Sequence, residues 1–137
     1  MGKTTTMTVE ICYGDCDPAG LVCLPRYQRW MEAAAVHFFM MCGTQWHEAA
    51  DGEGVVGTLL LEHCAKFIGR ATHGDSLLIR THIEDWRPRE FQQKHVITRR
   101  EELICECTET RMFCHRDPND RHLVGIAVPE VLRRLCE

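Results

Sequence analysis

A loop of unusual composition, Gly14-Asp15-Cys16-Asp17-Pro18-Ala19-Gly20, supplies two carboxylates just before the expected start of a helix. The first N–H groups of a helix have no intrahelical partner. Together with the helix dipole, they can hydrogen-bond a carbonyl oxygen as negative charge develops on it. A carboxylate facing that carbonyl could attack its carbon or deprotonate a water molecule that does so. The loop therefore points to acyl chemistry without a metal, although the same residue types also form ordinary turns.

The segment after this loop must position those N–H groups, and its pattern predicts a helix over residues 25–41. Pro25 suits the first helical position, with Leu24 as the cap residue, and Gly43 suits the position after the last turn. Its apolar side chains follow a spacing of three and four: Tyr27, Trp30, Met31, Ala34, Phe38 and Met41. Because further apolar residues fall on the opposite side, we expect most of the circumference to be buried. A short second helix is expected over residues 45–50.

The remaining elements are expected to be strands. Residues 7–13 alternate apolar and polar side chains before the helix. After the helix, strands are predicted over 55–61 (extending towards 68), 76–86, 90–99, 103–115 and 123–128, before a terminal helix opened by Pro129. Within residues 103–115, Cys105 and Cys107 should share one face. A run of consecutive strands after one helix predicts an α+β fold with an antiparallel sheet.

A long helix with little polar surface must be covered on more than one side. The sheet of the same chain can cover one side of it. We therefore expect a homo-oligomer, in which a second copy continues the sheet or covers the site.

Composition narrows the class of protein. A chain of 137 residues with a net charge of -4 predicts one domain over residues 1–137 and no attraction to nucleic acid. No apolar run is long enough to cross a bilayer, so no membrane partner is expected. The nine cysteines form no Cys-x-x-Cys pair, and the polar start of the chain suggests no secretion signal. We therefore expect a reducing cytoplasm, no metal, and cysteines that pack as small apolar side chains.

The segment YGDCDPAGLVCLPRYQRWMEAA, residues 13–34, closely resembles the signature of hotdog-fold acyl-CoA thioesterases of the 4-hydroxybenzoyl-CoA thioesterase family. The resemblance continues through VGT at 56–58, EDWR at 84–87, Phe91, His95 and VPE at 128–130, and so covers nearly the whole chain. It implies a hotdog fold, with one long central helix wrapped by a curved antiparallel sheet of about five or six strands. It also implies an acyl-CoA substrate, no cofactor, and a dimer or tetramer with the active site at the subunit interface.

The resemblance also implies roles for individual residues. Asp17 matches the catalytic aspartate, which acts as nucleophile or general base on the thioester carbonyl. Leu24 matches the position whose backbone N–H polarises that carbonyl. Glu32 and Trp46 match positions that line the acyl pocket, and Thr58 matches a segment that borders the pocket across a subunit interface.

The resemblance assigns Arg87 and Arg89 to basic positions near the nucleotide of coenzyme A, although Pro88 between them departs from the family pattern. Asp15 is interpreted as a loop residue that makes hydrogen bonds. Cys16 has no evident base beside it and is not expected to be a nucleophile. The histidines considered, His37, His47, His63 and His95, are expected to be structural or exposed.

The expected acyl group is aromatic and resembles hydroxybenzoyl, because the Glu32 carboxylate could accept a hydrogen bond from a ring hydroxyl and would not suit a long alkyl chain. Short-chain aliphatic acyl-CoA or acyl-carrier-protein thioesters are the main alternative. A hotdog dehydratase normally uses a histidine with a carboxylate, and the motif loop has no histidine. A non-catalytic acyl-CoA-binding module is the remaining alternative. Covalent anhydride formation and general-base hydrolysis both stay open.

Overall fold

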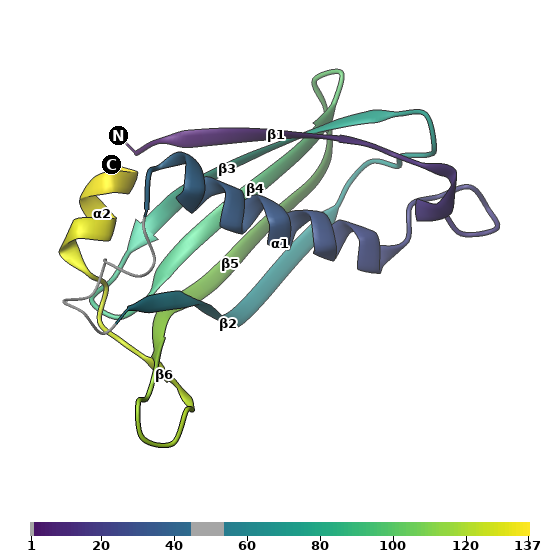
Figure 1. The fold of residues 1–137 in the computed structure, drawn as a ribbon. Helices are drawn as coiled ribbons and strands as arrows, with labels where there is room; N and C mark the ends of the chain where they lie inside the picture. The colour runs from purple at the N-terminus through teal and green to yellow at the C-terminus, as the bar shows by residue number, and fades with distance from the viewer. Residues whose placement is uncertain (1, 45–53) are drawn as a thin grey trace.

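The computed structural model describes residues 2–44 and 54–137. It contains a long helix, a short terminal helix and a sheet of six strands (Figure 1). The elements in chain order are β1 (Thr4–Glu10), the 3-10 turn η1 (Tyr13–Asp15), α1 (Leu24–Met41), β2 (Val55–Phe67), β3 (Ser76–Trp86), β4 (Phe91–Arg99), β5 (Glu102–Arg116), β6 (Leu123–Gly125) and α2 (Glu130–Cys136).

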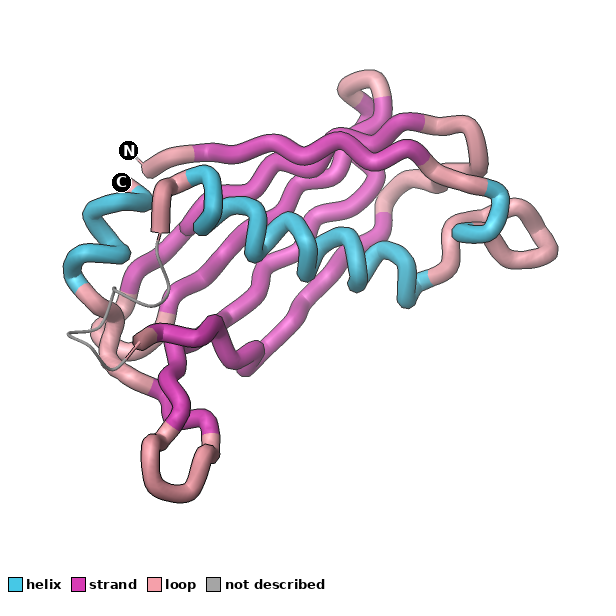
Figure 2. The backbone as a smooth tube through the Cα atoms, in the orientation of Figure 1, coloured by secondary structure: helices cyan, strands magenta, loops and turns pink. Residues whose placement is uncertain are grey.

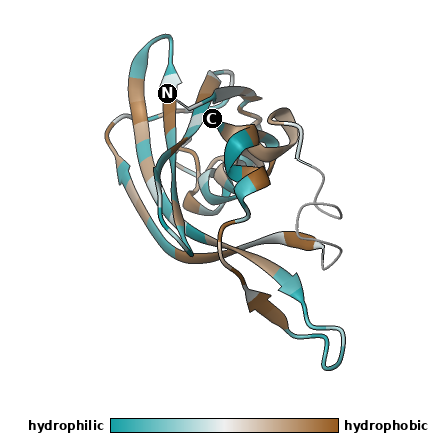
Figure 3. Cartoon of the chain, turned by 90° about the vertical axis from the view of Figure 1, so that its left-hand side faces the viewer, coloured by the Kyte–Doolittle hydropathy of each residue, from teal (hydrophilic) through white to brown (hydrophobic). Residues whose placement is uncertain are grey.

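All strand pairings are antiparallel, in the spatial order β1-β3-β4-β5-β2, with β6 paired to the end of β5. The helix α1 crosses one face of this sheet, and the strands curve around it (Figures 1 and 2). The β5–β6 hairpin extends away from the rest of the sheet (Figure 3). One long helix wrapped by an antiparallel sheet confirms the expected α+β hotdog architecture.

The helix α1 begins and ends close to the predicted residues. Leu24 is its first residue and Pro25 lies in the first turn, so Cys23 is the cap and the expectation of Leu24 as cap is wrong by one residue. Gly43 has φ +82°, a left-handed conformation that glycine adopts without a Cβ penalty, so it ends the helix as predicted.

Within one chain, α1 is buried only on the side facing the sheet. Its buried residues are Tyr27, Met31, Ala34, Ala35, Phe38 and Phe39. The opposite side leaves Val36 and Met40 exposed. The sheet of one chain therefore covers one face of the helix, and burial of the remaining circumference by a second copy stays a prediction.

The first strand lies three residues earlier than expected, over Thr4–Glu10 and not residues 7–13. Thr4, Thr5 and Thr6 pair with β3, and main-chain hydrogen bonding extends the strand without an apolar pattern. Tyr13 belongs to the 3-10 turn and is 80% exposed, so its expected place on the buried face of the strand is wrong.

Later strands follow the predictions closely. β3 has the predicted bounds, and β2, β4 and β5 differ from them only at their ends. The predicted last strand is shorter, Leu123–Gly125, and Pro129 caps α2 as the residue before its first turn. The predicted helix over residues 45–50 lies outside the described residues.

The core consists of two apolar clusters under α1. One cluster surrounds Tyr27 and Met31, and the other contains Phe38, Phe39, Phe91 and Phe113. All nine cysteines are free. Five of them are buried as predicted: Cys42, Cys105, Cys107, Cys114 and Cys136. The packing interpretation is wrong for Cys12 and Cys64, which are exposed. Among the residues with described positions, no helix has both the length and the apolar character needed to cross a membrane.

Candidate functional site

The loop singled out in the sequence is anchored through Asp15. One oxygen of its carboxylate, Oδ2, accepts a hydrogen bond from the backbone N–H of Cys12 at 2.8 Å, and the other lies 3.3 Å from Nε of Arg26 in an ion pair. Its carbonyl oxygen accepts a hydrogen bond from the N–H of Cys23 at 3.0 Å. Asp15 therefore ties the loop to the first turn of α1, which confirms its interpretation as a hydrogen-bonding loop residue.

Asp17 lies at the exposed tip of this loop, with one carboxylate oxygen fixed. Its Oδ1 atom accepts hydrogen bonds from the N–H groups of Ala19 at 2.9 Å and Leu21 at 3.1 Å. Its own N–H donates to the carbonyl of Leu21 at 2.8 Å. Gly20 closes the turn at φ +83°, where a side chain would be strained. The turn holds the carboxylate in one orientation and leaves it open to solvent.

The start of α1 presents backbone donors beside this loop. No side chain of the described residues caps the helix, since Cys23 makes no side-chain cap hydrogen bond. The N–H of Leu24 belongs to the first turn, where no intrahelical acceptor exists. Such a group, at the positive end of the helix dipole, can polarise a carbonyl oxygen.

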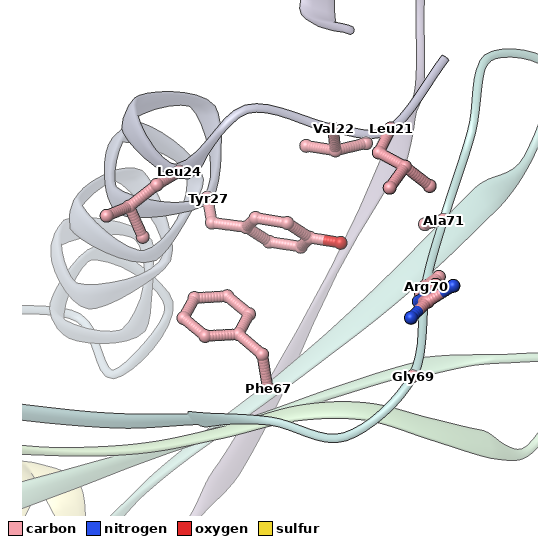
Figure 4. A pocket seen from close by; sticks show the side chains of 8 residues that line it. All are labelled: Leu21, Val22, Leu24, Tyr27, Phe67, Gly69, Arg70 and Ala71. Atoms are coloured by element: carbon pink, nitrogen blue, oxygen red, sulfur yellow. The ribbon is translucent and has the colours of Figure 1, made fainter. Parts of the chain in front are cut away.

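An apolar cavity of about 320 Å³ borders the same helix terminus (Figure 4). The side chains of Leu21 and Leu24 come from the loop and the helix, and Tyr27 and Phe67 lie across it in edge contact with ring centroids 5.0 Å apart. Burial raises the pKa of the Tyr27 hydroxyl, so it is a neutral group at physiological pH.

A second group of predicted residues meets further along α1. Glu32 lies two turns after Leu24, about 12 Å along the helix axis. Its carboxylate Oε2 accepts a hydrogen bond from Nη2 of Arg111 at 2.7 Å, and Nη1 of Arg111 donates to Oγ1 of Thr58 at 3.1 Å. Glu32 and Thr58 also line a cavity of about 270 Å³ between α1 and β2. The structure thus brings Glu32 and Thr58 together within one chain, whereas the resemblance implied that Thr58 reaches the pocket across a subunit interface. Trp46 lies outside the described residues.

Arg111 is a buried residue, 1% exposed, and its guanidinium is held by a second carboxylate. Both Nε and Nη2 donate to Oε1 of Glu109, at 3.3 Å and 2.9 Å. Burial lowers the pKa of the Arg111 guanidinium, but the hydrogen bond to Glu32 and the charge of Glu109 outweigh it and raise the pKa above its ordinary value. Arg111 is therefore a permanent buried cation.

Glu109 has further partners on the inner face of the sheet. His95 Nε2 lies 2.8 Å from Oε1, and His63 Nδ1 lies 2.8 Å from Oε2. Thr81 Oγ1 lies 2.8 Å from the other nitrogen of His95. Burial raises the pKa of the Glu109 carboxyl, but the hydrogen bond with His95 and the charge of Arg111 outweigh it and bring the pKa to about 2. His95 is structural as expected. His63 is partly buried and also belongs to this network.

One trio of side chains in the network could in principle hold a metal ion. The ligand atoms of His63, Cys107 and Glu109 lie within 4.8 Å of one another. Burial, with the nearby Glu109 charge, raises the pKa of the Cys107 thiol to about 12, and Glu109 already accepts hydrogen bonds at both oxygens. Hydrogen bonding accounts for these contacts, including the 3.5 Å approach of Cys107 Sγ to His63 Nδ1.

The arginines predicted near the nucleotide lie far from the loop within one chain. Arg87 and Arg89 follow the end of β3, whereas the loop follows the end of β1, which pairs with the start of β3. The length of β3 separates these ends by about 33 Å. Arg87 forms an ion pair with Asp85 at 3.0 Å, and Arg89 donates to the carbonyl of Gly125 at 3.2 Å. Both arginines are exposed.

Sequence reasoning missed Glu109 and Arg111. A signal for them existed, because Cys105 and Cys107 were predicted on one face of their strand. Continuing that alternation places Glu109 and Arg111 on the same buried face. Two charged residues at successive inward positions of a strand indicate that their charges are paired inside the protein.

Comparisons with known proteins agree with the fold and with the sequence motif. A family model described as the thioesterase-like superfamily matches residues 12–134. The chain is 36% identical over 142 residues to a 4-hydroxybenzoyl-CoA thioesterase from Pseudomonas sp. (strain CBS-3), covering 99% of both sequences.

Solved structures give the same relationship. A crystal structure of the D17N mutant of 4-hydroxybenzoyl-CoA thioesterase, in complex with 4-hydroxybenzoyl-CoA, superposes with a TM-score of 0.89. Its sequence is 35% identical, and the match covers 98% of this chain and 99% of that one. A gentisyl-coenzyme A thioesterase shares the fold at 23% identity and a TM-score of 0.78, covering 96% of this chain and 98% of that chain.

Proposed function

We propose, from the premise that this chain belongs to the thioesterase-like superfamily, that it hydrolyses an aromatic acyl-CoA thioester to the free acid and coenzyme A. The observation that carries the proposal is the 36% identity to a 4-hydroxybenzoyl-CoA thioesterase along the full length of both chains. The exposed Asp17 carboxylate, held by two backbone N–H groups of the loop that precedes α1, gives this relationship a chemical basis.

In the proposed reaction, the N–H of Leu24 hydrogen-bonds the thioester carbonyl oxygen and stabilises the negative charge that develops there. Asp17 acts on the carbonyl carbon in one of two ways. As a nucleophile, its carboxylate forms a bond to that carbon while the C–S bond breaks, and water then hydrolyses the resulting anhydride. As a general base, it takes a proton from a water molecule that attacks the same carbon. In both routes the thiolate of coenzyme A leaves and is protonated.

The acyl group is proposed to occupy the space between α1 and β2, with Trp46 at the same pocket. Glu32 and Thr58 line the cavity found there. The Oε1 atom of Glu32 can accept a hydrogen bond from a ring hydroxyl, whereas an alkyl chain would displace water from this oxygen and return no hydrogen bond. This favours a hydroxybenzoyl-like group over an aliphatic one.

We further propose that the active form is a homo-oligomer, a dimer or tetramer, with Arg87 and Arg89 of one subunit near the nucleotide of coenzyme A at the site of another. Two observations support this. Asp17 and the arginines lie at opposite ends of β3, so one chain cannot bring them to one ligand. The outward side of α1 leaves Val36 and Met40 exposed and offers apolar surface to a second copy.

Sedimentation velocity checks the oligomer, because a monomer that retains full activity would contradict it. The nine free cysteines also favour a reducing compartment, and we propose the cytoplasm. Localisation of a fluorescently tagged chain tests that assignment.

A panel of thioesters followed by free-thiol release tests the activity itself. We expect hydroxybenzoyl-CoA isomers to be preferred over hexanoyl-CoA in kcat/KM by more than about tenfold. The reverse preference would favour a short-chain aliphatic thioesterase. Faster hydrolysis of an acyl-carrier-protein thioester than of the matching CoA thioester would show that the substrate is carried by a protein and not by coenzyme A. Binding of hydroxybenzoyl-CoA without thiol release would overturn hydrolysis in favour of a binding module. Hydration of an unsaturated acyl-CoA would instead indicate a dehydratase.

A further inference from the structure

We propose that Arg111 is a positioning residue that fixes the carboxylate of Glu32 and thereby sets the preference for acyl groups carrying a hydrogen-bond donor. The inference rests on the proposed function and extends it to a residue buried beneath the pocket. It concerns how selectivity for the ring substituent arises, and it leaves the chemical step at Asp17 unchanged.

The first support is that one guanidinium joins both predicted pocket residues. Arg111 donates to Glu32 at 2.7 Å and to Thr58 at 3.1 Å, although these residues lie on α1 and β2. The side chain of Arg111 is 2% exposed, whereas that of Glu32 is 59% exposed. A fixed buried cation thus holds a carboxylate whose remaining surface is open to a ligand.

The second support is the division of hydrogen bonds on Glu32. Arg111 occupies Oε2 only, and Oε1 makes no hydrogen bond to any residue within 2–44 and 54–137. An acceptor oxygen of a charged carboxylate is thereby left for a donor from outside the chain. A ring hydroxyl can satisfy it, while an unsubstituted ring would remove water from it and return no hydrogen bond.

The third support is that Arg111 cannot move to accommodate another ligand. Its Nε and Nη2 atoms donate to Oε1 of Glu109, the next inward residue of β5. Glu109 is in turn held by His95 and His63, each at 2.8 Å. The guanidinium therefore has contacts on three sides, and the direction in which it presents Nη2 to Glu32 is set by the core.

The test compares two substrates that differ only in the donor. The ratio of kcat/KM for 4-hydroxybenzoyl-CoA to that for benzoyl-CoA is measured for the native chain, Arg111→Met, Glu32→Gln and the double variant. We expect Arg111→Met to lower this ratio at least about tenfold, because the acceptor loses its orientation. In the Glu32→Gln background, Arg111→Met should change the ratio no further, because Arg111 acts through Glu32.

Arg80→Met, on an exposed position of β3, serves as the matched control and should leave the ratio unchanged. A merely structural role of Arg111 would lower both kcat/KM values together and keep their ratio, and that result would overturn the inference. An equal fall of the ratio in both Glu32 backgrounds would also overturn it.

A conservative variant keeps the test decisive if Arg111→Met does not fold. Arg111→Lys retains the charge, but a single ammonium cannot span Glu32, Thr58 and Glu109 together. The ratio of the two kcat/KM values should therefore be lower for Arg111→Lys than for the native chain. A folded lysine variant with an unchanged ratio would contradict the proposal. If the native chain hydrolyses neither 4-hydroxybenzoyl-CoA nor benzoyl-CoA, both the proposed function and this inference are wrong. Hydrolysis of both esters with a ratio insensitive to Arg111 removes the inference alone.

Discussion

The carbonyl oxygen of Asp15 accepts a hydrogen bond from the N–H of Cys23, 3.0 Å away, so the loop that carries Asp17 closes back on the residue that caps α1. The Asp15 side chain adds hydrogen bonding to Cys12 and an ion pair with Arg26. These contacts fix the Asp17 carboxylate relative to the first N–H groups of the helix. The loop and the helix terminus therefore form one rigid unit.

Replacing Asp15 by alanine should loosen this unit. The variant loses the acceptor for the N–H of Cys12 and the partner of Arg26, while the backbone contact to Cys23 remains. We expect kcat to fall about tenfold, because the Asp17 carboxylate is no longer held in a fixed position relative to the first N–H groups of α1. Thermal unfolding should show a loss of about 1 kcal/mol. Asp15→Asn keeps an acceptor oxygen, and an equal loss of activity in both variants would contradict the anchoring role.

Asp17→Asn should reduce turnover of hydroxybenzoyl-CoA by at least about 100-fold and leave the fold intact. The amide can still accept hydrogen bonds from Ala19 and Leu21 through its oxygen, so the turn should persist. It cannot act as a nucleophile or a base. Steady-state kinetics and circular dichroism measure the two effects, and retained full activity would remove Asp17 from the mechanism.

Glu109→Gln should change the dependence of stability on pH. The pKa of the Glu109 carboxyl is about 2 in the folded chain and 4.5 in its ordinary state, so below pH 5 the unfolded chain binds the proton more readily. The contribution of Glu109 is complete above about pH 5 and is lost as the pH falls towards 2, by about 3 kcal/mol in all. Denaturant unfolding between pH 7 and pH 3 should show a shallower decline for Glu109→Gln than for the native chain. Equal slopes would show that Glu109 does not supply this dependence.

Thiol alkylation should divide the cysteines by burial. Burial raises the pKa of Cys105 to about 11 and that of Cys107 to about 12, so neither forms the reactive thiolate at pH 8. Cys12 and Cys64 are exposed and should react with iodoacetamide in the folded protein. Peptide mass spectrometry locates the labels, and unfolding in guanidinium should make all nine reactive. Rapid labelling of Cys107 in the folded chain would contradict the packing shown here.

Much of the architecture could be predicted because its signals are local. Alternation with a period of two gave the bounds of β3, and a spacing of three and four gave α1 to within one residue. The predicted start of the first strand is three residues late. Thr4, Thr5 and Thr6 belong to β1 because their main chain pairs with β3, and the side-chain pattern of the sequence does not indicate this pairing. The burial of most of α1 stays a prediction, because it depends on coverage by a second copy of the chain.

The candidate site divides in the same way. The role of Asp15 could be predicted because its partners Cys12, Cys23 and Arg26 lie nearby in sequence. The contact between Glu32 and Arg111 joins residues 79 positions apart and depends on how α1 crosses β5, so local patterns could not reveal it. The roles of Leu24, Thr58, Arg87 and Arg89 at a bound substrate stay predictions, as does that of Trp46.

The polar network of Thr81, His95, Glu109 and Arg111 lies between the two apolar clusters of the core. Side chains in different clusters, such as Met31 and Phe113, belong to separate packing groups and should contribute nearly additively to the free energy of unfolding. Laboratory evolution could therefore redesign the end of the molecule near Asp17 without readjusting the aromatic end, as long as the charged residues between them are retained.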